Sequence, residues 1–332
     1  MTLVIAEAGV NHNGNINIAK ELIYEAKDCG ADIIKFQTFK TELGISKKTP
    51  IVPYQSRNNK TFKTQYELIK ELELSYDQFR LLKEYSDKIG IEFLSTAFDI
   101  QSIRFLNEIG IKRFKIPSGE ITNLPYLRAI SECQKPVIIS TGMSEMFEIE
   151  DALKVFLKKG YSKQNISILH CTTQYPTAPD EVNLNAMITI SEEFNTQVGY
   201  SDHTEGIDIA IAAVALGAKV IEKHLTLNRN FIGPDHQASI EPKQLKAMID
   251  SIRKIEKATG NGIKGPTKSE KEIKKLVRKS IVANKNIKEG EQFTVENLIV
   301  KRPGTGISPM LWDKVIGKIS NKNYFEDDLI DL

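Results

Sequence analysis

The chain has 332 residues, which is long for a single hydrophobic core and favours one large domain with a smaller companion. Its 45 basic and 43 acidic residues leave a net charge of +2, so charge gives no reason to expect a nucleic acid or an anionic membrane as partner. The three cysteines have no paired spacing, and the sequence shows no signal-peptide pattern. No apolar run approaches the roughly 20 residues that a membrane span needs. These features predict a cytoplasmic protein.

Short β-rich runs recur along the first 258 residues, and a stretch of helical periodicity follows each one. The predicted strands cover 2–8, 32–37, 91–96, 113–117, 136–141, 165–170, 196–201 and 219–225. The predicted helices cover 16–29, 76–89, 99–109, 123–132, 145–159, 183–193, 206–217 and 241–258. Eight such units in about 250 residues predict a closed (β/α)8 TIM barrel. A doubly wound open sheet has the same alternation, but no GxGxxG turn follows the first strand.

Two stretches interrupt this rhythm. Residues 40–65 are polar, contain prolines and lack clear periodicity, so a loop that covers a substrate is a reasonable hypothesis there. After residue 258 the chain becomes rich in Gly, Lys and Thr, and 259–275 is predicted to be a linker. Residues 276–332 have short β-rich runs and predict a small β-rich domain that follows the 1–258 barrel.

Polar side chains stand at the carboxyl end of every predicted strand, where a barrel keeps its active site. In chain order they are Glu7; Lys35 and Gln37; Ser95 and Thr96; Lys115, Ser118 and Glu120; Ser140 and Thr141; His170; His203; Glu222 and His224. We therefore expect one polar site at this mouth of the barrel.

The histidines suggest a metal site. All five, His12, His170, His203, His224 and His236, lie at or just beyond predicted strand ends. A single histidine is more often a hydrogen-bonded core residue, but His203 and His224 on the neighbouring seventh and eighth strands together favour a divalent metal. Two imidazoles without a firm third ligand indicate an open site that substrate or water completes. Asp235 and Glu120 are candidates for the surroundings of the metal or for the substrate.

Two lysines point to an anion. Lys35 and Lys115 lie inside strands that are otherwise apolar, where a lysine is unusual unless it is paired. With Thr96, Ser118 and Ser140 nearby in barrel order, they could hold a phosphate and a carboxylate. A buried ion pair with Glu7 or Glu120, or a Schiff-base lysine of an aldolase, would also explain such lysines.

The small domain contributes one further candidate. Arg302, in the sequence KRPGTGISP, follows a short predicted strand, and Gly304 and Gly306 give its loop a permissive backbone. An exposed arginine is usually a solvated charge, but such a loop also suits contact with another surface.

Ten ordered motifs resemble the bacterial sialic acid synthase family, which includes N-acetylneuraminate synthase and legionaminic acid synthase. They are IAEAGVNHNG, IIKFQTFK, LSTAFD, FKIPSGEITNLP, IISTGM, LHCTTQYPT, GYSDHTEG, VIEKHLTL, GPDHQAS and VKRPGTGISP. The resemblance covers the whole chain, and its C-terminal part is similar to the antifreeze-like (SAF) module of that family.

This resemblance implies a metal-dependent condensation of phosphoenolpyruvate with an N-acetylated hexosamine, with release of phosphate. The sugar would be N-acetylmannosamine, giving N-acetylneuraminate, or 2,4-diacetamido-2,4,6-trideoxymannose, giving N,N'-diacetyllegionaminate. It implies that His203 and His224 bind Mn2+ or Mg2+, and that phosphoenolpyruvate is held by Lys35, Thr96, Lys115, Ser118 and Ser140. It further implies that Glu7, Glu120, Tyr175 and Asp235 meet the sugar or the attacking water.

The resemblance also implies a domain-swapped homodimer, in which Arg302 reaches the other subunit's site and binds the N-acetyl group. One departure concerns Thr173, which stands where some sialic acid synthases have Asn, and it puts one phosphoenolpyruvate contact in doubt while resembling the legionaminate type. Two rival functions are a Schiff-base aldolase, which the histidine pair disfavours, and a carbohydrate- or ice-binding protein without activity, which leaves the polar strand ends unexplained.

Overall fold

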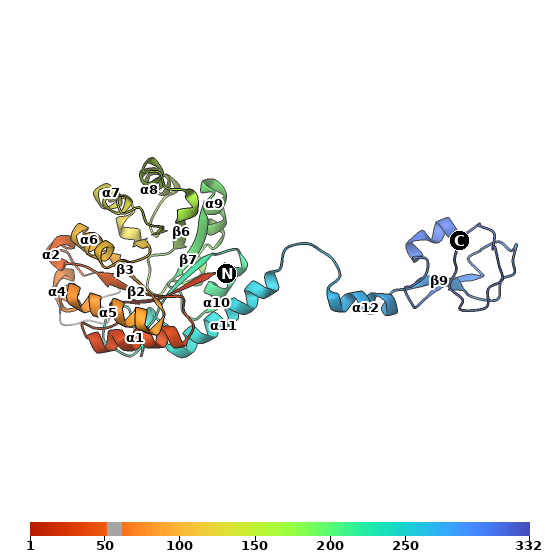
Figure 1. Ribbon diagram of the computed structural model, residues 1–332, viewed down its shortest axis with the longest axis horizontal. Helices are drawn as coiled ribbons and strands as arrows, with labels where there is room; N and C mark the ends of the chain where they lie inside the picture. Colours follow the sequence, from red (N-terminus) through yellow and green to blue (C-terminus); the bar gives the residue numbers. More distant parts are fainter. Residues whose placement is uncertain (52–61) are drawn as a thin grey trace. The chain divides into compact units, whose positions relative to one another are not determined.

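The computed structural model describes residues 1–51 and 62–332, and its strands form the predicted barrel (Figure 1). The strands are β1 (Leu3–Gly9), β2 (Ile33–Thr38), β3 (Glu92–Ala97), β4 (Phe114–Ile116), β5 (Val137–Ser140), β6 (Ile166–Cys171), β7 (Gln197–Asp202) and β8 (Val220–His224). All neighbours are parallel, and β1 pairs with both β2 and β8. The sheet therefore closes on itself, which confirms the TIM barrel and excludes the open doubly wound sheet.

Helices surround the barrel, one after each strand (Figure 1). They are α1 (Ile16–Asp28), α5 (Tyr76–Ile89), α6 (Ile100–Glu108), α7 (Leu124–Ser131), α8 (Met146–Lys158), α9 (Asn185–Phe194), α10 (Asp208–Ala215) and α11 (Pro242–Thr259). Local signals set their ends: a capping box of Ser75 and Gln78 opens α5, and Gly90, with φ of 77°, closes it. Their apolar faces bury a continuous layer against the outside of the strands.

The described part of the connection from β2 to α5 contains the helices α2 (Thr41–Gly44) and α4 (Gln65–Glu71). The sequence reading expected no periodic structure over 40–65, so α2 is a feature that it missed. A four-residue helix leaves too short a pattern to recognise. The hypothesis of a covering loop falls in part on residues 52–61, which lie outside the described residues.

The structure divides into two compact units, Met1–Gly260 and Asn261–Leu332. The second contains α12 (Lys268–Val277), the antiparallel pair β9 (Ser280–Ala283) and β10 (Leu298–Lys301), and α13 (Trp312–Val315). It has its own apolar core, which includes Ile281, Phe293 and Tyr324. Helix α12 includes the second half of the predicted linker, and its capping box of Thr267 and Glu270 is a start signal readable in the sequence. No helix among the described residues is long and apolar enough to cross a membrane.

Candidate active site

The inward faces of the strands change from apolar to polar between the floor of the barrel and its mouth. Buried apolar side chains fill the lower level: Ile5, Ile33, Leu94, Ile138, Leu169 and Val220. Two residues further along the same strands come Glu7, Lys35, Thr96, Ser140, Cys171 and Glu222. Because side chains alternate between the two faces of a strand, an offset of two places both sets on the inward face. A polar layer therefore lies directly above an apolar floor.

A cavity of about 520 Å³ opens above this floor, within the usual size range of small-molecule sites. It is lined by the site residues that the sequence analysis placed in the barrel: Glu7, Lys35, Thr96, Lys115, Ser118, Glu120, Ser140, Thr173, Tyr175, His203, His224 and Asp235. The loops and strand ends that carry them are spread over more than 220 residues of sequence. The closed barrel brings them together at one mouth.

The two lysines share the cavity wall with two carboxylates. The Nζ of Lys35 lies 2.9 Å from Oε1 of Glu7 and 3.7 Å from Oε2 of Glu222. The Nζ of Lys115 lies 3.4 Å from Oε1 of Glu222 and donates to Oγ of Ser140 at 2.7 Å. The Lys35–Glu7 ion pair, one of the alternatives read from the sequence, is thus present. It leaves Lys35 on the cavity wall, so pairing and anion binding are compatible.

Burial and mutual charge set the protonation of these groups. Burial raises the pKa of Glu7, and Lys35 opposes this only in part. Burial also acts on Glu222, but the Lys115 and Lys35 charges outweigh it and lower its pKa. Lys35 keeps a raised pKa because Glu222 and Glu7 outweigh its burial, whereas burial lowers the pKa of Lys115. Lys35 and Glu222 are therefore stabilised in their charged forms, whereas burial disfavours the charged forms of Lys115 and Glu7.

His203 and His224 lie side by side on the wall formed by β7 and β8. Their ring centroids are 5.6 Å apart, and the Tyr175 ring packs 4.1 Å from that of His203. Burial lowers the pKa of His203 to about 4 and holds the pKa of His224 well below its usual value, so both imidazoles are neutral at pH 7. Nδ1 of His203 lies 2.7 Å from the carbonyl oxygen of Thr172. A proton on that nitrogen leaves the lone pair of Nε2 free for a ligand.

This donor chemistry fits a divalent metal. Neutral imidazole lone pairs are the form that binds metal, and buried Nδ1 of His224 has no hydrogen-bond partner among the described residues. Within residues 1–51 and 62–332, no three His, Cys, Asp or Glu side chains are grouped so that they could hold an ion together. An ion held by His203 and His224 would take its remaining ligands from substrate or water oxygens.

The other three histidines have local partners outside the cavity. His12 accepts from the backbone N–H of Gly14, and His170 contacts the carbonyl of Val182 at 2.7 Å. His236 contacts Thr226 through Nδ1 at 2.7 Å. All five histidines do lie near strand ends, but only His203 and His224 line the cavity.

The turn at Gly9 gathers further polar groups. A Cβ at Gly9 would lie 3.4 Å from Oε1 of Glu7, 3.5 Å from Nε2 of Gln37 and 3.7 Å from Oδ2 of Asp235. The backbone φ of Gly9 is +51°, a conformation that favours glycine. Burial raises the pKa of Asp235 to about 6. Amide, carboxylate and carboxylic acid groups at this spot suit the hydroxyl and amide groups of a sugar.

At the rim of the cavity, the polar side chains Glu120 and Ser118 form hydrogen bonds with neighbouring loop residues. Glu120 is half-buried and accepts a hydrogen bond from Nδ2 of Asn123 at 2.6 Å. The ion-pair partners of Lys35 and Lys115 at this site are Glu7 and Glu222, not Glu120. Ser118 accepts from the backbone N–H of Gly142 at 2.9 Å. A side chain on Gly142 would collide with the hydroxyls of Thr173 and Ser118, which explains glycine at this close approach.

Arg302 is exposed in the second unit, where its Nε donates to the carbonyl of Val277 at 3.0 Å.

Glu222 is the main cavity residue that the sequence analysis placed at a strand end without giving it a role. It lies within ion-pair distance of both lysines, and Oγ of Ser201 donates to it at 3.1 Å. The signal was available, because strand alternation places residue 222 on the same face as His224. Gln37 and Cys171 also line the cavity.

The fold and site together define a TIM-barrel enzyme whose single mouth joins buried amines, carboxylates and neutral imidazoles. Residues 22–264 match the NeuB family, and residues 278–331 match the SAF domain. The chain belongs to the NeuB family.

Relatives of known name agree with this assignment. The chain is 54% identical over 329 residues to N,N'-diacetyllegionaminic acid synthase of Campylobacter jejuni, covering 99% of this chain and 98% of that protein. It is 47% identical over 324 residues to the enzyme of the same name from Legionella pneumophila, covering 96% and 90%. A crystal structure of N-acetylneuraminic acid synthetase from Leptospira borgpetersenii in complex with citrate is 37% identical, covers 82% of this chain and 90% of its own, and has a TM-score of 0.72. The recognition of a sialic acid synthase from the sequence motifs is confirmed.

Proposed function

We propose that this enzyme condenses phosphoenolpyruvate with the open-chain aldehyde of an N-acetylated hexosamine and releases phosphate. The first candidate sugar is 2,4-diacetamido-2,4,6-trideoxymannose, because two close relatives carry the name of the N,N'-diacetyllegionaminic acid synthase. The second is N-acetylmannosamine, which would give N-acetylneuraminate, the product in the name of the solved relative.

One observation carries the proposal: a single cavity combines an anion-binding side with a pair of neutral imidazoles. Lys35, Lys115 and the hydroxyls of Thr96, Ser118 and Ser140 supply donors for the carboxylate and phosphate of phosphoenolpyruvate. Thr173, on the same wall, would add a contact to this substrate. The imidazoles stand on β7 and β8, where the aldehyde oxygen of the sugar would be placed.

The reaction has three steps: formation of the carbon–carbon bond, addition of water and release of phosphate. Carbon 3 of phosphoenolpyruvate forms a bond to the aldehyde carbon, whose oxygen takes up a proton, and positive charge grows at carbon 2. Water adds at carbon 2, and Glu7 is placed to accept its proton, since a raised pKa suits a group that exchanges protons near neutral pH. The bond from carbon 2 to the phosphate oxygen then breaks while the added hydroxyl becomes the ketone oxygen and gives its proton to the leaving phosphate, whose charge Lys35 and Lys115 stabilise.

A divalent ion, Mn2+ or Mg2+, held by His203 and His224 would polarise the aldehyde carbonyl as a Lewis acid. Glu120, Tyr175 and Asp235 line the same cavity and would orient the sugar through their hydroxyl and carboxyl groups.

We extend the proposal to a domain-swapped homodimer, in which Arg302 of one subunit binds the N-acetyl group in the other subunit's cavity. An exposed guanidinium in a loop with Gly304 and Gly306 suits this role. We also place the reaction in the cytoplasm, since Cys29, Cys133 and Cys171 are unpaired.

Phosphate release tests the proposal. The purified chain, stripped of metal with EDTA and resupplied with Mn2+ or Mg2+, should release phosphate from phosphoenolpyruvate only when one of the two sugars is present. His224→Ala should abolish this release, and His170→Gln, a strand-end histidine outside the cavity, should retain it. Trapping of a substrate adduct by borohydride, with activity that survives EDTA, would instead support the Schiff-base aldolase.

A further inference from the structure

We infer that an apolar wall at the outer rim of the cavity binds the methyl-bearing substituents of the sugar and thereby selects the diacetamido-trideoxy sugar over N-acetylmannosamine. The wall consists of Val10, Phe39, Ile45, Ile69 and Phe98. This inference rests on the proposed function, because it names the substrate group that the same site distinguishes.

The wall is continuous with a small apolar core of its own. Val10 and Phe39 are buried in a cluster separate from the main barrel core, and Ile69 and Phe98 pack against it. The rings of Phe39 and Phe98 meet edge to face, with centroids 6.4 Å apart. Ile45, Ile69 and Phe98 are half-buried and line the cavity, so apolar surface faces the cavity.

The wall lies where the far end of the sugar must go. Val10, Phe39 and Phe98 come just after β1, β2 and β3, beyond the polar layer that contains Lys35 and Thr96. In a closed ring of eight strands, β3 is diametrically opposite β7, which leads into His203. An aldehyde placed at the imidazoles, with phosphoenolpyruvate in the polar layer at the lysines, leaves the rim above that layer, beyond the ends of β2 and β3, for the rest of the sugar chain.

The chemistry of the two candidate sugars differs at two carbons. The diacetamido-trideoxy sugar has an acetamido group at carbon 4 and a methyl group at carbon 6, where N-acetylmannosamine has hydroxyls. Apolar side chains gain from burying methyl groups, and they leave a buried hydroxyl without a partner. An apolar wall therefore favours the first sugar, within the range of about 10- to 200-fold that one such group can supply.

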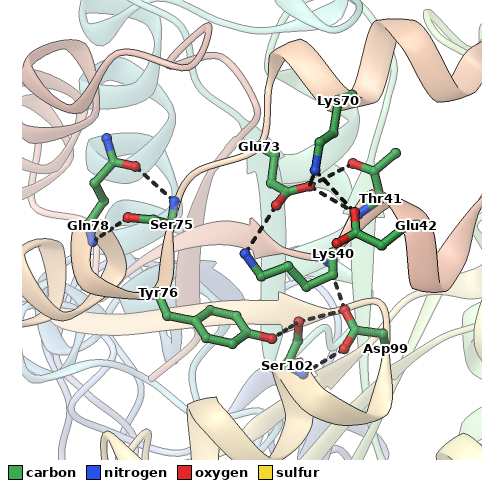
Figure 2. Close-up of polar contacts among 10 residues, drawn as sticks. All are labelled: Lys40, Thr41, Glu42, Lys70, Glu73, Ser75, Tyr76, Gln78, Asp99 and Ser102. Atoms are coloured by element: carbon green, nitrogen blue, oxygen red, sulfur yellow. Dashed lines mark hydrogen bonds and ion pairs between the residues drawn. The ribbon is translucent and has the colours of Figure 1, made fainter.

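A polar clamp holds α2, the helix directly before wall residue Ile45, in place (Figure 2). Glu73 accepts from the backbone N–H and hydroxyl of Thr41 at 3.1 and 2.9 Å. The Nζ atoms of Lys40 and Lys70 lie 3.1 and 3.0 Å from its carboxylate. Asp99 accepts from the backbone N–H of Lys40 at 2.9 Å. The short helix that leads to Ile45 is thus fixed by side chains, and the ammonium of Lys40, which borders the cavity, is already paired.

Threonine substitutions at the wall test the inference. The measured quantity is the ratio of kcat/KM for the diacetamido-trideoxy sugar to kcat/KM for N-acetylmannosamine. Ile45→Thr and Ile69→Thr should each lower this ratio about 10-fold, with the KM for phosphoenolpyruvate unchanged. Leu43→Thr is the matched control, because Leu43 lies on α2 and is 49% exposed but does not line the cavity. Its ratio should stay within twofold of the parent.

Several results would overturn the inference. They are a parent enzyme that prefers N-acetylmannosamine, an unchanged ratio in both wall variants, or an equal fall in Leu43→Thr. If Ile45→Thr also raises the KM for phosphoenolpyruvate, Ile45→Leu serves as the second variant, because leucine keeps the apolar surface. A sugar ratio and a phosphoenolpyruvate KM equal to those of the parent in Ile45→Leu support the wall. Values that stay as in Ile45→Thr refute it. Absence of phosphate release with either sugar in the parent refutes the proposed function itself, which is a distinct outcome.

Discussion

Removal of the Lys223 ammonium should strongly destabilise the barrel. Lys223 and Asp202 form an ion pair at 2.8 Å, and both side chains are fully buried. The Nζ of Lys223 also donates to the carbonyl of Thr204 at 2.6 Å. The pair links the carboxyl ends of β7 and β8, which carry His203 and His224, from the face opposite to the cavity.

The cost of Lys223→Met can be estimated from these contacts. The variant leaves the Asp202 carboxylate buried without its cation, although Thr204 still donates to it through N–H and Oγ1 at 2.9 and 2.7 Å. Removing one partner of a buried ion pair typically costs about 3–5 kcal/mol. In a domain of this size each 1 kcal/mol lowers Tm by about 2–4 °C, so Tm should fall by roughly 6–20 °C.

Urea unfolding of the full chain, followed by circular dichroism, measures this cost. Lys246→Met is the matched control, because the Lys246–Asp250 pair is 52% and 61% exposed and should contribute less than about 0.5 kcal/mol. The double variant Asp202→Asn with Lys223→Met removes the orphaned charge, so it should recover at least about 1 kcal/mol of the loss. A Lys223→Met protein within about 1 kcal/mol of the parent, or a double variant no more stable than the single one, would refute the reasoning.

Three further predictions concern charge and metal. Burial raises the pKa of Glu73, but donors from Thr41, Lys70 and Lys40 outweigh it and lower the value to about 2. Glu73 should therefore add up to ~3 kcal/mol above pH 4.5 and lose it as the pH falls toward 2. The unfolding free energies of Glu73→Gln and the parent should converge over that interval, and a constant gap would contradict this. His224→Ala should weaken Mn2+ binding at least 10-fold, as read from the electron paramagnetic resonance of free Mn2+, and unchanged affinity would remove the metal assignment. Arg302→Ala should raise the KM for the sugar far more than that for phosphoenolpyruvate, and equal sugar KM values in variant and parent would argue against a swapped arginine.

Local patterns were sufficient for much of the barrel. Strand and helix alternation is a short-range property, so all eight units and most of their ends could be read from the sequence. The barrel rule for strand ends then selected cavity residues far apart in the chain, such as Lys35 and His203. Helix α2 was not predicted because four residues form too short a periodic pattern. Helix α12 was not predicted because its capping box lies in a Lys-rich stretch that resembles a linker.

Sequence alone determined which side chains could meet at the mouth of the barrel, since alternation along each strand fixes the face on which a residue stands. It placed Glu222 and His224 on one face and Lys223 on the other. Only the tertiary structure decided the partners: Lys115 with Glu222, Lys223 with Asp202, and two of five histidines with each other. These pairings depend on which strands become neighbours and how far each loop extends. A contact between distant segments produces no recognisable pattern in the sequence of either segment alone.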